Sequence, residues 1–259
     1  MSDVIEVSRN GAIVTVALNR PDRMNALNLP MWHGLAEAFT TIAADSSIHA
    51  VILRGSGTSA FAPGADIEEF DTLRANADQA KAYDLVMRKA LNAVRDCPQP
   101  VVAAIYGPCV GGALELACCC DLRISARSGK FGVPINKISV VMAYPELAAI
   151  RRIVGPAATL EILLEGRIID ADEAAAKRLI NRVVDDEAME AEIATTAKRI
   201  AAGAPLANRW HKAFLSRLDD PTPISETELD ECYRFLGTRD YAEGLAAFRA
   251  KRKPVFTAE

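Results

Sequence analysis

Residues 101–120 of this chain read VVAAIYGPCVGGALELACCC. Val101–Ile105 is a short apolar run typical of a strand buried on both faces, and Ala113–Cys120 is an apolar run that indicates a helix. Gly111 and Gly112 stand where that helix is expected to begin. Glycine there lets a ligand approach the backbone, and the first N–H groups of a helix have no acceptor within it. The stretch therefore predicts a strand–turn–helix unit whose helix start can bind a phosphate, or an oxygen that becomes negative during a reaction.

The double glycine alone does not identify a ligand. The Walker phosphate loop needs Lys followed by Ser or Thr, and the dinucleotide loop needs Gly-x-Gly-x-x-Gly, and neither pattern is present. Close packing of the turn against a strand explains two adjacent glycines about equally well.

Glu115 strengthens the case for chemistry, because it follows Gly112 by three residues and shares one face of the first helical turn with it. Its neighbours are apolar, and glutamate is seldom fully buried without a partner. A carboxylate in a dry site beside backbone donors suits proton transfer next to a stabilised enolate. The alternative is a glutamate that offsets the helix dipole and packs against an arginine.

The surrounding pattern predicts an α/β protein. Further buried strands are expected at Ile13–Leu18, Ala50–Arg54 and Leu122–Ala126. Helices are expected around the Met31, Leu35, Phe39 and Ile42 stripe, where Asn28 is the cap, and at Leu147–Val154 and Ala171–Leu179, the last with a capping box from Asp170 to Glu173. Thr72–Tyr83 is expected to be a mobile polar stretch. We place a core at residues 1–186 and a helical oligomerisation region at residues 187–259.

Composition narrows the function classes. The 259 residues are 50% hydrophobic and 25% charged, with 30 Lys and Arg against 34 Asp and Glu, which argues against disorder and provides no basic field for nucleic acid. No apolar run is long enough for a membrane span, and Met1-Ser2-Asp3 resembles no signal peptide. The consecutive cysteines 118–120 and the scattered histidines suggest buried thiols in a reducing cytoplasm and no metal site.

Several motifs together resemble the enoyl-CoA hydratase/isomerase (crotonase) superfamily, over nearly the whole chain. In the family's order they are Asn19-Arg20-Pro21 with Asn25-Ala26-Leu27, Phe61-Ala62-Pro63-Gly64-Ala65-Asp66, Ala104-Ile105-Tyr106-Gly107, Gly111-Gly112-Ala113-Leu114-Glu115-Leu116, Cys120-Asp121, Glu243-Gly244, Ala247-Phe248 and Lys251-Arg252-Lys253-Pro254. The resemblance implies a spiral of ββα repeats, followed by helices that build trimers, often paired into hexamers.

The resemblance also implies a site for an acyl-CoA thioester, in which coenzyme A is part of the substrate and no separate cofactor is needed. Ala65 and Gly112 would donate backbone N–H groups to the thioester oxygen, and Glu115 would act as acid and base. The remaining implied binding residues are Met24, Ala26, Asp66 and Ile67 at the CoA moiety, Ile135 at the acyl chain, and Phe248 and Lys251 at a neighbouring subunit's nucleotide end.

One position departs from the family pattern. Typical hydratases carry a second glutamate directly after the proline of the Phe-Gly-x-Pro segment, and this chain has Ile135 there. Three interpretations stay open. Glu115 alone orients water; or Asn136, Tyr144 or Glu146 replaces the lost carboxylate; or the reaction needs only enolate stabilisation with one proton donor, as in the family's acyl-CoA decarboxylases.

Each replacement candidate also has a purely structural explanation. Asn136 can cap a turn, Tyr144 can pack in the core, and Glu146 fits the first turn of a helix through the helix dipole. The resemblance favours a hydratase-type lyase. An isomerase, a decarboxylase or a family member that binds acyl-CoA without turnover remains the alternative.

Overall fold

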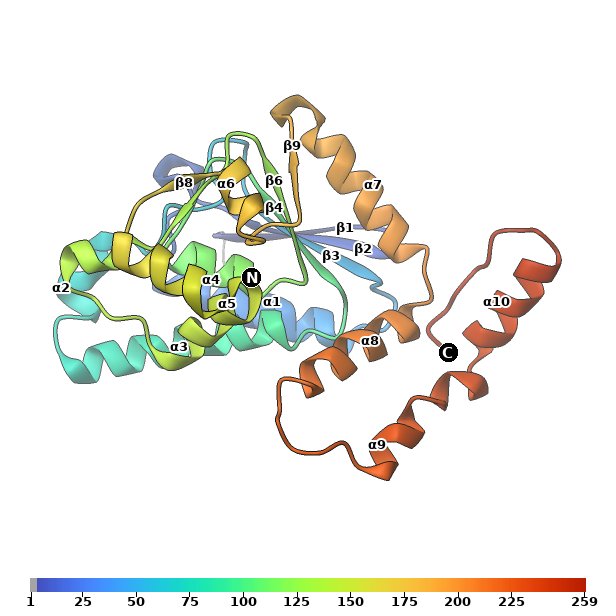
Figure 1. The fold of residues 1–259 in the computed structure, drawn as a ribbon. Helices are drawn as coiled ribbons and strands as arrows, with labels where there is room; N and C mark the ends of the chain where they lie inside the picture. The colour runs from blue at the N-terminus through green and yellow to red at the C-terminus, as the bar shows by residue number, and fades with distance from the viewer. Residues whose placement is uncertain (1–3) are drawn as a thin grey trace.

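The computed structural model describes residues 4–259, so the predicted lack of a signal peptide at Met1–Asp3 lies outside the described residues. A six-stranded sheet forms the centre of the molecule (Figure 1). Its order is β1 (Ile5–Asn10), β2 (Ile13–Leu18), β3 (Ala50–Gly55), β4 (Val101–Ile105), β6 (Leu122–Ala126) and β9 (Arg182–Val184). β1 is antiparallel to β2, and every other neighbouring pair is parallel. The four strands expected from the sequence are confirmed.

A second sheet lies beside the first and contains β5 (Pro108–Val110), β7 (Lys130–Gly132) and β8 (Ile169–Asp170). The chain visits the two sheets in turn and then forms a helix. β4 and β5 lead into α4 (Gly112–Cys118), and β6 and β7 lead through a 3₁₀ turn into α5 (Tyr144–Glu165). Each ββα unit adds its strands parallel to those of the previous unit, so the chain advances as a spiral.

The central strands are buried on both faces, which explains their continuous apolar sequences. In β3, Val51 and Leu53 join the core beneath α1 (Leu29–Ala44) and α3 (Ala77–Arg95), whereas Ile52 joins the core beneath α7 (Met189–Ala201). α1 begins as predicted, because the Asn28 side chain accepts a hydrogen bond from the Met31 N–H at 3.1 Å.

Three local expectations need correction. The stretch expected to be mobile includes the end of α2 (Phe70–Leu73) and the first turns of α3, which the Asn76 side chain caps. The first turns of α3 are polar and face solvent, and the buried side chains of this helix begin only at Tyr83. α6 ends at Ala176, short of the predicted end at residue 179. The helix predicted at residues 147–154 is part of the longer α5, which is interrupted at Gly155, where φ is 74°.

The C-terminal part is helical, as predicted, with α7, α8 (Pro205–Arg217), α9 (Glu226–Glu231) and α10 (Arg239–Arg249). α7 packs Met189, Ile193 and Ala197 against the sheet. Because α7 shares a core with the sheet, the expected domain boundary after residue 186 stays a prediction. Residues 218–259, which we call the C-terminal arm, stand away from the sheet (Figure 1).

A cavity of about 410 Å³ separates α8 from α10 on the C-terminal arm. It is lined mostly by apolar side chains, among them Trp210, Phe214, Phe235, Leu245 and Phe256. All six cysteines are free thiols; five are buried, as predicted, and Cys232 is exposed on the arm. No helix within residues 4–259 has the length and apolar character that a bilayer span requires.

Candidate active site

The loop after β2 is fastened to the loop after β3 by two polar side chains of the Asn19–Leu27 motif. Asn25 is 1% exposed, and its Nδ2 donates to the carbonyl oxygens of Ser56 and Ala60 at 3.1 and 3.0 Å. Arg20 donates to the Ala26 carbonyl at 2.7 Å and forms an ion pair with Asp66 at 2.9 Å. These bonds fix the backbone immediately before Leu27.

Leu27 in turn fixes Ala65. The Leu27 N–H donates to the Gly64 carbonyl and the Leu27 carbonyl accepts from the Asp66 N–H, both at 2.8 Å. The Ala65 N–H lies between these two bonds and has no acceptor among the described residues. Gly64 has a φ of 120°, and a Cβ there would lie 3.1 Å from the Val110 carbonyl oxygen. Glycine is therefore needed for the loop to approach β5 so closely.

The second unpaired donor comes from the start of α4. Gly111 has a φ of 56° and donates its N–H to the Gly132 carbonyl at 2.9 Å. Gly112 is the first residue of α4, so its N–H has no acceptor within the helix. A Cβ on Gly112 would lie 3.6 Å from the Trp32 ring, an ordinary contact.

Ala65, Gly112 and Glu115 line one cavity of about 470 Å³. Apolar side chains form most of its wall, including Trp32, Ile67, Phe70, Met87, Ile135, Ile138, Val141 and Met142. A concave apolar site with a few polar groups is typical of small-molecule binding. A larger cavity of about 720 Å³ between α8 and the central sheet contains none of the predicted site residues.

The Glu115 side chain is 8% exposed and has no hydrogen bond or ion pair with another described residue. Among the described residues no arginine pairs with Glu115, although Arg88 and Arg95 line a small chamber beside it. Burial, and secondarily the charge of Glu146, raises the pKa of Glu115 to about 7. A carboxyl group with that pKa can both release and accept a proton near neutral pH.

A chain of ion pairs runs along one side of the cavity and ends at Glu146. Arg74 pairs with Asp84 at 3.4 Å, and Asp84 pairs with Arg88 at 3.4 Å. The Arg88 Nε then donates to Oε1 of Glu146 at 3.0 Å. Sequence analysis missed all three, because Asp84 and Arg88 lie on α3 and Arg74 in the turn before it, and none of them belongs to a motif.

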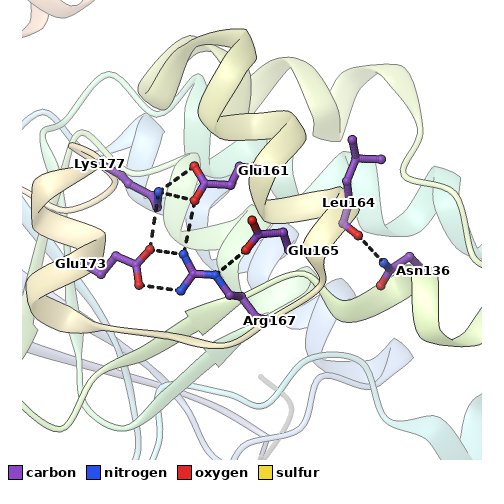
Figure 2. A network of polar contacts seen from close by, with 7 residues as sticks. All are labelled: Asn136, Glu161, Leu164, Glu165, Arg167, Glu173 and Lys177. Carbon is purple, nitrogen blue, oxygen red and sulfur yellow. Dashed lines mark hydrogen bonds and ion pairs between the residues drawn. The ribbon is translucent and has the colours of Figure 1, made fainter.

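The structure separates the three candidates for a second polar group. Asn136 donates from Nδ2 to the Leu164 carbonyl at 2.9 Å, so it holds the end of α5, beside the network around Arg167 (Figure 2). Tyr144 is 90% exposed, and the expectation that it packs in the core is wrong. Neither side chain lines the cavity, whereas Glu146, in the first turn of α5 as predicted, does.

The remaining predicted residues occupy three places. Ile67 and Ile135 line the cavity. Met24, Ala26 and Asp66 lie next to it in the segments joined through Leu27. Phe248, which is 84% exposed, and Lys251 are on the C-terminal arm and do not line this cavity. No group of three His, Cys, Asp or Glu residues within the described range could hold a metal ion.

Comparison with known proteins finds the same family that the sequence motifs resemble. The family model described as enoyl-CoA hydratase/isomerase matches residues 8–259. The chain is 36% identical over 258 residues to a probable enoyl-CoA hydratase of Mycobacterium tuberculosis, covering 98% of both chains. It is 32% identical over 260 residues to a crotonyl-CoA hydratase of Syntrophomonas wolfei, again covering 98% of both.

Solved structures agree closely with this fold. A crystal structure described as an enoyl-CoA hydratase/carnithine racemase from Magnetospirillum magneticum is 84% identical, with a TM-score of 0.99 over 100% of this chain and 97% of the other. An enoyl-CoA hydratase from Bacillus anthracis is 31% identical, with a TM-score of 0.92 over 99% of this chain and 100% of the other. The crotonase-like spiral expected from the sequence is confirmed.

We predict that Glu115→Gln stabilises the fold at high pH. A carboxyl group whose pKa rises from 4.5 to about 7 on folding makes the folded state less stable as pH rises through that window. Relative to the variant, the wild type should lose about 1.4 kcal/mol per pH unit there, or on the order of 3 kcal/mol in total. Below the lower value the two proteins should differ little. Urea denaturation across this pH range measures the effect.

Glu228→Gln is the control of opposite sign. Arg217 and the Ser225 N–H lower the pKa of Glu228 to about 2, so its stabilising contribution is present above pH 4.5 and lost as pH falls. If the pH profiles of wild type and Glu115→Gln run parallel, Glu115 is not held in a desolvated site.

Proposed function

This chain belongs to the enoyl-CoA hydratase/isomerase (crotonase) family, and we propose that it catalyses the reversible addition of water to the double bond of a 2-enoyl-CoA thioester. The observation that carries the proposal is the meeting of two unpaired N–H groups, of Ala65 and Gly112, with the buried Glu115 at one cavity. Two similar proteins whose names contain enoyl-CoA or crotonyl-CoA hydratase support it.

In this proposal the thioester oxygen accepts hydrogen bonds from Ala65 and Gly112. Polarisation of the carbonyl makes the β-carbon electrophilic and stabilises the enolate that forms when water adds there. The donors are main-chain groups held by neighbouring backbone bonds, so they need little reorganisation during the reaction.

Glu115 manages the proton at the α-carbon. The oxygen of a water molecule bonds to the β-carbon, the α-carbon gains a proton from Glu115, and the proton released by the water restores the Glu115 carboxyl group; the reverse sequence removes water. A pKa of about 7 leaves a large share of the Glu115 carboxyl groups protonated near neutral pH, as this step requires.

Met24, Ala26, Asp66 and Ile67 are proposed to contact the CoA moiety, which belongs to the substrate, and Ile135 the acyl chain. Isomerisation or decarboxylation on the same donors remains the alternative, because Ile135 stands where a second carboxylate is typical. A cytoplasmic location is also proposed, supported by the six free thiols.

The first test is turnover of crotonyl-CoA, followed through the absorbance of its conjugated thioester. We expect the absorbance to fall with the wild type and Glu115→Gln to slow this about 10²–10⁴-fold, the usual contribution of general acid–base catalysis. CoA binding, measured by calorimetry, should persist in the variant. A wild type that binds CoA without consuming crotonyl-CoA would point instead to the alternatives.

A second test removes one N–H without removing the loop. Gly112→Pro deletes the donor at the first helical position, where proline is well tolerated, and should slow turnover about 10²–10³-fold. Gly112→Ala keeps the donor, and its methyl group meets the Trp32 ring at an ordinary distance. If the alanine and proline variants lose activity equally, the Gly112 N–H is not an oxyanion donor.

We also propose that the C-terminal arm packs against further copies of this chain in a trimer or a pair of trimers, where Phe248 and Lys251 reach a neighbouring subunit's CoA. The exposed apolar side chains of the arm and its cavity beside α8 support this. Light scattering at micromolar concentration should show the assembly, and Phe248→Asp should weaken it. Leu160→Asp, on the exposed face of α5, is the control. A monomeric wild type would contradict the proposal.

A further inference from the structure

Glu146 combines deep burial with an incomplete set of hydrogen bonds. The residue is 3% exposed. Its Oε1 accepts a hydrogen bond from Arg88, but its Oε2 is buried and has no hydrogen-bond partner among the described residues. A buried carboxylate oxygen without a partner is costly, and such atoms in native proteins call for an explanation such as a bound water, an ion or a catalytic role. The ion pair with Arg88 therefore leaves half of this carboxylate unaccounted for.

Glu146 borders two spaces at once. It lines the main cavity together with Glu115, Ala65 and Gly112. With Glu115 and Arg88 it also lines a small chamber of about 20 Å³ between α3, α4 and α5. A space of that size accommodates one water molecule, which needs two to four polar partners. The two carboxylates and the guanidinium provide them.

We propose that Glu146 is the second carboxylate of the active site, and that it binds the water that adds to the enoyl thioester and takes the proton from it. This inference rests on the proposed hydratase function. The oxygen of the water bonds to the β-carbon, its proton passes to Glu146, and Glu115 protonates the α-carbon. A proton then returns from Glu146 to Glu115 through the next water in the chamber, which restores both groups.

The location of Glu146 explains how Ile135 can be tolerated. The carboxylate typical of hydratases follows the proline of the Phe131–Pro134 segment, in the turn before α5, whereas Glu146 lies in the first turn of α5 itself. Both positions line the same cavity. The chain thus supplies a carboxylate to this cavity from the next element, and the vacated position carries an apolar side chain.

The charges around Glu115 assign the two roles. Glu146 and Asp84 raise the pKa of Glu115 and Arg74 lowers it, while Arg88 and Arg95 line the small chamber. Arg88 donates a hydrogen bond to Glu146 at 3.0 Å, whereas Glu115, whose pKa is about 7, has no ion-pair partner among the described residues. A pair of carboxyl groups held in different environments is the usual arrangement for one acid and one base.

The kinetic test compares Glu146→Gln with Glu146→Asp and with Glu190→Gln. Gln keeps the shape but removes the base, so kcat for crotonyl-CoA should fall about 10²-fold or more, with little change in KM. Asp keeps the charge and should recover part of the loss. Glu190 pairs with Arg54 at 2.8 Å and does not line the cavity, so its Gln variant should match the wild type.

A second readout does not depend on turnover. The carboxyl group of Glu115 can be titrated by infrared or ¹³C NMR spectroscopy, and removal of the Glu146 charge should move its titration to lower pH in Glu146→Gln but not in Glu146→Asp. An unchanged titration overturns the inference even if the wild type has no hydratase activity.

The outcomes separate the two proposals. If Glu115→Gln is inactive and Glu146→Gln retains the wild-type rate, the hydratase function stands and the role of Glu146 is wrong. If Gln and Asp at position 146 lose activity equally, the charge of Glu146 is not what the reaction uses, and the inference is overturned.

Discussion

The two main-chain bonds between Leu27 and the Gly64–Asp66 segment are the constraint on which the site depends. They leave the Ala65 N–H free and hold it beside the start of α4. Side chains at positions 65 and 112 contribute little, because the donors belong to the backbone. The residues that matter are those that hold this backbone in place. Asn25 and Arg20 fix the segment before Leu27, and Gly64 is needed because β5 lies too close for a Cβ.

Burial of two carboxyl groups in one cavity works against stability. Glu115 has no ion-pair partner among the described residues, and burial raises its pKa. Arg88 donates to only one of the two carboxylate oxygens of Glu146. A core built for stability alone would place apolar residues at both positions. The ion-pair chain from Arg74 to Arg88 offsets part of that cost and holds the second carboxylate at the cavity wall.

The sequence predicted the elements whose signals are local. Buried strands appear as apolar runs, Asn28 marks the start of α1, and Gly111-Gly112 marks the turn before α4. The family motifs added residues that the structure places at or beside one cavity, except Phe248 and Lys251, which lie on the C-terminal arm. Their chemical roles stay predictions.

Other features could not be predicted, because they depend on packing between distant segments. The first turns of α3 look like a polar loop, and Tyr144 looks like a core residue although it is exposed. A glutamate in the first turn of a helix is usually a surface residue that favours the dipole. Only the folded arrangement of α3, α4 and α5 buries Glu146 and brings Arg88 to it.

The distribution of cysteines has a practical consequence. Burial raises the pKa of five thiols, at positions 97, 109 and 118–120, which keeps them protonated and inaccessible to alkylating reagents. Cys232 is exposed and lines the apolar cavity of the C-terminal arm. The native protein therefore offers one thiol for a fluorescent label, at a position where its emission reports directly on whatever surface covers the arm.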